Sequence, residues 1–204
     1  MIKTDGTELP LNPLQYRHTA SLDTKETNPL LKRLLKPYRR YFDIFENYDL
    51  FGTKIPAMAA FHSRGEKYVL TKKAKLWGVE CHEYVFFFQT EKLTADAFDE
   101  MAELLKKAET EFVKPHDEHM YTHLTAIISA EKTDSEAEKM LCAFKSRKNY
   151  LFSLHGWSDI RMVLIETAET KKDSEDTESF HIASNKNGRE TAKLLMSELT
   201  EQKK

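Results

Sequence analysis

A long stretch rich in aromatic and β-branched residues does most to limit the folds that this chain can adopt. Its segments with strand character are residues 55–63, 66–77 and 81–90. They are separated by Ser63-Arg64-Gly65 and by the region near Gly78, so the stretch predicts an antiparallel meander of neighbouring strands. A long amphipathic helix should follow from Thr94, because apolar residues recur three to four apart until Pro115 ends the pattern.

Helical and strand patterns alternate along the rest of the chain. Helices are expected at residues 29–45, with a kink or split at Pro37, and at 135–148 and 189–199. Further strands are expected at 124–130, 150–155, 160–167 and 179–183. The element order is α-β-β-β-α-β-α-β-β-β-α. It predicts a single α+β domain over residues 29–204, with an antiparallel-rich mixed sheet flanked by helices. Residues 1–28 are polar and show no sustained period, so we expect a flexible N-terminal arm whose last residue, Asn28, caps the first helix.

The charges of the chain nearly balance, since 31 Lys and Arg face 33 Asp and Glu for a formal net charge of −2. No overall field attracts nucleic acid or anionic lipid, and any such binding has to be local. The longest apolar run, residues 84–88, is far shorter than the ~20 residues that a membrane-spanning helix needs. Cys81 and Cys142 are too few for a secreted disulfide framework. We therefore expect a cytoplasmic protein without a membrane partner.

Histidines are concentrated in the segment KPHDEHMYTH. His116 and His119 can share one face of a turn that begins at Pro115, with Glu118 beside them and His123 on the following strand. Imidazole and carboxylate groups are ligands that zinc and similar divalent ions accept. The segment is therefore a candidate divalent-metal site, although it lacks the HExxH register and a fourth ligand. A catalytic histidine without metal and ordinary surface histidines remain open alternatives.

The segment LHGWSDIR brings a histidine, a serine, an aspartate and an arginine close together in sequence. A catalytic triad is not expected, because neighbours along a hairpin alternate faces and no GxSxG elbow presents Ser158. Asp159 is suited to bonding turn backbone, and an exposed Trp157 beside Arg161 suits ligand binding. We keep Trp157, Asp159 and Arg161 as candidate binding residues.

Basic residues gather in the first predicted hairpin, which carries Arg64 and Lys67, and in residues 32–40 of the first helix. With the aromatic residues near them, they would suit the phosphates and bases of a nucleic acid. They can equally be the solvated faces of amphipathic elements. Arg64 and Lys67 are retained as candidate binding residues.

The order of helix, three strands, helix and strand is similar to the core of the PD-(D/E)xK nuclease superfamily. That resemblance implies an acid on the second strand and an acid-x-lysine pattern on the third, which hold magnesium and polarise water. Here Glu83 is followed by Val85 where the pattern has lysine. Glu80 and Glu83 would need a lysine from another strand, so the resemblance implies at most a degenerate nuclease-like enzyme.

A second resemblance is carried by the segments AFHSRGEKYVLTKKAKLWG, FVKPHDEHMYTHLTAIIS, LHGWSDIRMVLIE and NKNGRE. On these segments the chain resembles an uncharacterised bacterial domain family, found mainly in Firmicutes, over about residues 30–200. The resemblance implies a cytoplasmic α+β domain and transfers no activity, cofactor or catalytic residue.

The favoured hypothesis is a non-enzymatic binding or regulatory module for a protein or a nucleic acid, because aromatic and basic residues abound while complete catalytic motifs do not. The alternative is a metal-assisted hydrolase or degenerate nuclease-like enzyme that uses His116, His119 and His123. Convergence of these imidazoles in one pocket would support the enzyme, and imidazoles on different sides of the molecule would remove its distinctive support. Self-association is a third hypothesis, if residues 86–88 lie in an edge strand.

Overall fold

The computed structural model describes residues 28–68, 75–168 and 179–200. The elements are α1 (Pro29–Leu35), β1 (Asp43–Leu50), β2 (Thr53–Tyr68), β3 (Lys75–Leu93), α2 (Ala95–Phe112), β4 (His119–Thr133), α3 (Ser135–Ala143), β5 (Arg147–Asn149), the single turn η2 (Leu151–Ser153), β6 (Trp157–Ala168), β7 (Ser179–Ser184) and α4 (Arg189–Thr200). The predicted order of helices and strands and the α+β class are confirmed. No helix within the described ranges is long and apolar enough to cross a bilayer.

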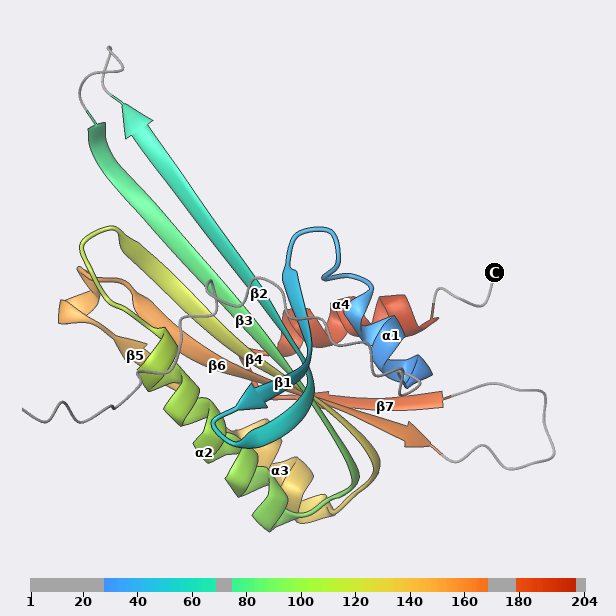
Figure 1. The fold of residues 1–204 in the computed structure, drawn as a ribbon. Helices are drawn as coiled ribbons and strands as arrows, with labels where there is room; N and C mark the ends of the chain where they lie inside the picture. The colour runs from blue at the N-terminus through green and yellow to red at the C-terminus, as the bar shows by residue number, and fades with distance from the viewer. Residues whose placement is uncertain (1–27, 69–74, 169–178, 201–204) are drawn as a thin grey trace, which may run out of the picture.

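One mixed seven-stranded sheet forms the centre of the domain (Figure 1), in the order β1-β2-β3-β4-β6-β5, with β7 also paired to β6. β1, β2 and β3 form an antiparallel meander. The meander predicted over residues 55–90 corresponds to β2 and β3, and β1 is a strand that was not predicted. β4 runs parallel to β3, and β6 runs parallel to β4. Parallel neighbours need a long crossover, which α2 supplies between β3 and β4.

Helices cover both faces of the sheet (Figure 1). α2 and α3 pack on the face that includes Phe86 and Leu124, whereas α1 and α4 pack on the face that includes Phe87 and Ile127. Successive residues of a strand point to opposite faces, so the middle of each central strand, such as Phe86–Phe88 of β3 and Ala126–Ile128 of β4, is apolar on both faces. β3 is paired with β2 and with β4 at Phe86 and Phe87. These two residues therefore do not lie at a sheet edge, as self-association through them would require.

The first helix is shorter than predicted. Asn28 caps α1 as expected, because its Oδ1 accepts a hydrogen bond from the Leu30 N–H at 2.9 Å. The helix nevertheless ends at Leu35, and residues 43–45, predicted as helical, belong to β1. Pro37 accounts for the difference, because its ring prevents the preceding turn from continuing as a helix.

Two predicted strand breaks are wrong. Ser63-Arg64-Gly65 lies inside β2 and Gly78 lies inside β3, where Gly65 pairs with Val79 and Gly78 with Glu66. The strand predicted at residues 66–77 is consequently divided between β2 and β3, on either side of residues 69–74, which lie outside the described residues. Glycine is depleted in strands but does occur inside them, so a glycine by itself does not mark the end of a strand.

The segment before β6 also differs from the prediction. Residues 150–155 form a loop around η2 and not a strand, and residues 157–159 begin β6 and do not form a turn. The predicted helix 135–148 ends at Ala143, because residues 147–149 pair with the first residues of β6 as β5. Pairing with a strand that follows in sequence outweighs the local helical pattern at these residues.

Candidate functional site

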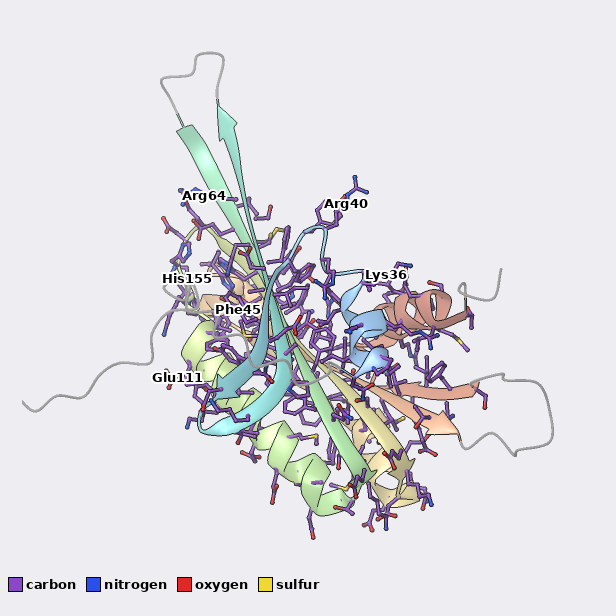
Figure 2. All side chains as sticks on the ribbon, turned by 45° about the vertical axis from the view of Figure 1, so that its right-hand side comes forward. Lys36, Arg40, Phe45, Arg64, Glu111 and His155 are labelled. Atoms are coloured by element: carbon purple, nitrogen blue, oxygen red, sulfur yellow. The ribbon has the colours of Figure 1, made fainter. Side chains whose placement is uncertain are left out.

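Every described histidine except His181 lies at the end of the sheet where β4 and β6 begin. Figure 2 shows Arg64 and His155 at this end. Because neighbouring strand residues point to opposite faces, the polar side chains here form two groups. We name them the histidine cluster, on the face of α2 and α3 (His62, Glu80, His82, His116 and His119), and the His123 cluster, on the face of α1 and α4 (Tyr121, His123, Trp157, Asp159 and Arg161).

The histidine cluster is held together by direct contacts between side chains. The Nδ1 atoms of His62 and His82 are 2.7 Å apart, so one donates a hydrogen bond and the other accepts it. The ring of His82 stacks on that of His119, with centroids 6.1 Å apart. His116 Nε2 lies 3.1 Å from Glu80 Oε2, and the other oxygen of Glu80 pairs with Arg64. Because the Nδ1 atom that accepts the hydrogen bond between His62 and His82 carries no proton, at least one of these two imidazoles is neutral.

His119 is buried and has both ring nitrogens engaged. Its Nδ1 lies 2.7 Å from the carbonyl oxygen of His155, which can only accept, so Nδ1 carries the proton. Its Nε2 then accepts from the Thr122 hydroxyl at 2.9 Å. Burial lowers the pKa of His119, in keeping with a neutral ring. His119 therefore joins β4 to the loop before β6.

The neutral rings of the histidine cluster predict a loss of stability in acid. Burial, with smaller contributions from the neighbouring His62 and His119, lowers the pKa of His82 to about 4, and Glu80 opposes this shift. An unfolded chain, with an ordinary histidine pKa of ~6.5, binds the proton first, so stability falls as the pH is lowered from about 6.5 to about 4. We expect His82 to account for roughly 1–2 kcal/mol of this loss, after discounting for its partial exposure.

The measurement is the free energy of unfolding in urea between pH 7 and pH 4. His82→Asn should reduce its pH dependence, because the variant lacks a ring that binds its proton at a lower pH in the folded chain than in the unfolded chain. Equal pH dependence in His82→Asn and the native chain would contradict the assignment.

The His123 cluster combines a buried ion pair with stacked rings. His123 Nδ1 lies 2.8 Å from Asp159 Oδ1, and Arg161 Nε lies 3.3 Å from the same oxygen. The ring of Tyr121 stacks on that of His123 at 4.3 Å between centroids and lies 5.7 Å from that of Trp157. Burial raises the pKa of Tyr121 to about 12, so its hydroxyl stays neutral. The cluster ties β4 to β6 across the sheet.

The predicted metal ligands do not converge. His116 and His119 belong to the histidine cluster, Glu118 pairs with Arg64, and His123 lies on the opposite face of the sheet. Within the described ranges, no group of three or more His, Cys, Asp or Glu side chains is arranged to hold a metal ion. The distinctive support for a metal-assisted hydrolase is thereby removed.

The structure brings some of the predicted binding residues together. Trp157, Asp159 and Arg161 alternate along β6 and share one face. Arg64 lies near the opposite face, where it bonds Glu80 and, at 2.7 Å, Glu118. The side chain of Lys67 lies outside the described residues.

The side chains also fail to form the nuclease pattern. Glu83 is paired with Phe61 on β2, where that pattern has an acid, and Glu80 lies three positions before Glu83 along β3. The two carboxylates therefore point to opposite faces. Ser158 and Asp159 likewise point to opposite faces of β6, as the argument against a triad anticipated.

A buried polar network lies beneath the loop that precedes β6. The Glu109 side chain on α2 is fully buried, and Lys148 Nζ lies 2.6 Å from its Oε2. Ser158 Oγ donates to Glu109 Oε1 at 2.7 Å, and the Tyr150 hydroxyl lies 2.8 Å from Ser158 Oγ. The network fixes the first residue of the loop, Tyr150, to α2 and β6.

The loop itself exposes large apolar side chains. We call Leu151, Phe152, Ser153 and Leu154 the apolar loop; Leu151 is 56% exposed, Phe152 96% and Leu154 72%. Leu151, Phe152 and Ser153 have φ values of 46°, 51° and 69°, a left-handed conformation that disfavours each non-glycine residue by roughly 1 kcal/mol. The loop is closed by hydrogen bonds from Tyr150 N–H to Gly156 O at 3.0 Å and from His155 N–H to Tyr150 O at 3.1 Å.

The local sequence does not reveal the apolar loop, because YLFSLH has the composition of a buried strand. The one local signal was Gly156, whose φ of 73° turns the chain into β6. The exposure of Phe152 depends on the pairing of β5 with β6. The order of apolar and polar residues around Phe152 does not indicate that pairing.

These features define a class: a three-layer α+β domain with one mixed sheet, two separate polar clusters and a hydrogen-bonded apolar loop at the same end. The model of a family described as a domain of unknown function (DUF8052) matches residues 26–196, and the chain belongs to that family. No curated protein and no solved structure matches the chain. The expected bacterial, mainly Firmicute, origin stays a prediction.

Proposed function

We propose that this domain is a protein-binding module whose contact surface is centred on the apolar loop. The observation that carries the proposal is the exposure of Phe152, at 96%, between two further exposed leucines. Single exposed apolar residues are ordinary, but a group of large ones on one projecting loop is typical of an interaction site. An exposed aromatic side chain at its centre suits a binding hot spot in a partner's apolar pocket.

The rigidity of the loop supports the proposal further. Tyr150 is tied to Glu109 through Ser158, and the carbonyl of His155 is tied to His119. Ordering a flexible loop reduces affinity, so a loop that is already fixed binds more tightly for the same contact area. A left-handed conformation held at three consecutive exposed residues contributes no packing of its own, which favours a functional explanation.

A nucleic-acid partner has less support. Of the basic residues in and after α1, Arg33 donates to the Leu199 carbonyl at 2.9 Å, Lys36 lies 3.4 Å from Glu198, and Arg39 lies 3.7 Å from Glu46. Arg64 is engaged by two carboxylates. Side chains already paired with acids release less free energy on binding phosphate, so a protein partner is the better match.

The proposal is tested by site-specific photo-crosslinking in cells that naturally produce this protein. A photoreactive amino acid in place of Phe152 should form an adduct with one defined protein, and the adduct should disappear when Leu154→Ser is added. The matched control carries the same amino acid at Tyr41, which is also exposed, at 64%.

With the captured protein purified, Phe152→Ser should weaken binding at least about 30-fold, as loss of a hot spot does. It should leave the free energy of unfolding unchanged, because the Phe152 ring packs against little. Identical adducts at positions 152 and 41, or no adduct above background at 152, would overturn the proposal.

A further inference from the structure

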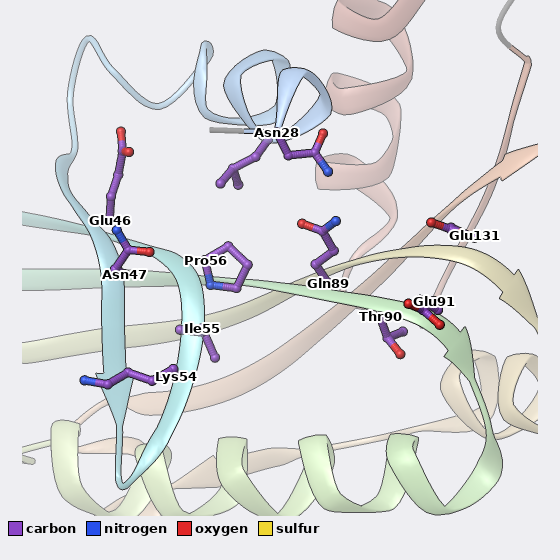
Figure 3. A pocket seen from close by; sticks show the side chains of 11 residues that line it. Asn28, Glu46, Asn47, Lys54, Ile55, Pro56, Gln89, Thr90, Glu91 and Glu131 are labelled. Atoms are coloured by element: carbon purple, nitrogen blue, oxygen red, sulfur yellow. The ribbon is translucent and has the colours of Figure 1, made fainter. Parts of the chain in front are cut away.

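The sheet splits at the end opposite the apolar loop. β2 pairs with β3 as far as Ala57, which lies opposite Phe87, whereas Lys54 and Ile55 pair only with β1. Pro56 stands at the point of divergence and has no N–H to donate to β3. Figure 3 shows Pro56, Ile55 and Lys54 on β2 as it turns away from β3.

β3 continues past the split with one edge open. It remains paired with β4 from Phe88, opposite Ile128, to Leu93, opposite Thr133. On its other side, no strand within the described ranges pairs with it beyond Phe87. Unpaired backbone N–H and C=O groups along a strand accept another extended segment, by the addition of a strand to the sheet.

Space for such a segment exists along this edge. Three hollows, of about 930, 660 and 290 Å³, all border Gln89 and Thr90. The largest lies between β2 and α2 and is lined on the helix by Ala97, Met101 and Leu104. These side chains are partly buried, so an added strand would find apolar contacts on the helix as well as backbone partners on β3.

We call the three hollows together the groove. The segment of this molecule best placed to fill it is the part of the chain before Asn28. Asn28 lines two of the three hollows and lies close to Gln89 and Thr90 in both of them (Figure 3). The 27 residues that precede Asn28 therefore enter the domain at the mouth of the groove. We propose that residues 14–20 add to the open edge of β3 as a further strand.

The sequence of residues 14–20, LQYRHTA, suits this role. It contains neither proline nor glycine, unlike the preceding residues, and it alternates Leu14 and Tyr16 with Gln15 and Arg17. Residues 21–27 form a tether that spans up to about 23 Å when extended, enough to return along a short strand. Because the segment is covalently attached, its effective concentration at the groove is on the order of millimolar, and weak intrinsic affinity is sufficient.

The experiment measures amide hydrogen exchange in the full chain, at the amides between Phe88 and Leu93 that point away from β4. In the native chain these amides should exchange at least about tenfold more slowly than in Gln15→Pro, because proline in the added strand removes a donor and disturbs its geometry. Thr7→Pro, outside the proposed strand, is the matched control and should behave as the native chain.

Rapid exchange in the native chain, equal to that in Gln15→Pro, would show that the groove is empty and would overturn the proposal. Slow exchange that survives Gln15→Pro would also overturn it. If that slow exchange disappears on dilution, the occupant is a second copy of the chain. This test does not involve the apolar loop, so its outcome is independent of the proposed protein-binding function.

Discussion

Replacing Gly156 with alanine is expected to lower the free energy of unfolding by about 3–4 kcal/mol, the largest effect of any glycine substitution considered for this protein. Gly156 has a φ of 73°, which L-residues with a side chain rarely adopt. A Cβ placed there would lie 2.5 Å from the His119 carbonyl oxygen and would also collide with that of Met120. Both obstacles are backbone atoms of β4, so neither can move without disturbing the sheet.

Gly52→Ala is the matched control for this prediction. Gly52 also has a left-handed φ, of 93°, but a Cβ there meets nothing within 4 Å. Its substitution should therefore lose only the conformational contribution, about 1 kcal/mol. Urea unfolding of the two variants separates the clash from the backbone preference. If both lose the same free energy, β4 and the loop before β6 are not packed as closely as the structure indicates.

Replacing Lys148 with methionine is expected to destabilise the domain by about 2–3 kcal/mol. The substitution leaves the fully buried Glu109 carboxylate without its cation, and an uncompensated buried charge is strongly unfavourable. The expected loss is smaller than for a fully buried pair because Lys148 itself is half exposed, and solvent screens part of the interaction.

Lys106→Met makes the same change at an ion pair of α2, the helix that carries Glu109, but with an exposed acid. Lys106 Nζ lies 2.7 Å from Glu103 Oε1, and Glu103 is largely exposed, so less than about 0.5 kcal/mol should be lost. The comparison uses urea unfolding at pH 7, with amide exchange of residues 150–156 as a second readout. Equal losses for the two lysines would contradict the role of Glu109 as a buried anchor of the apolar loop.

In the candidate site, residues that are close in sequence are not always close in the folded structure. His116, His119 and His123 are close in sequence, yet β4 begins at His119 and turns His123 to the other face of the sheet. His116 stays close to His119, but the residues that complete their cluster, Glu80 and His82 of β3 and His62 of β2, are distant from them in sequence. No spacing rule within one segment identifies such a group, because strand pairing brings its members together.

The amino-acid sequence by itself determined the α+β class of the domain, the long helix α2, the apolar middle of β3 and β4, and the cap at Asn28. These depend on periodicity and on the chemistry of single residues, which are local properties. Tertiary structure decided the parallel pairing of β3, β4 and β6, the extension of β2 and β3 through glycine, the open edge of β3 and the exposure of Phe152. Each of these depends on which strand pairs with which, and the free energy of that pairing comes from contacts between residues far apart in the chain.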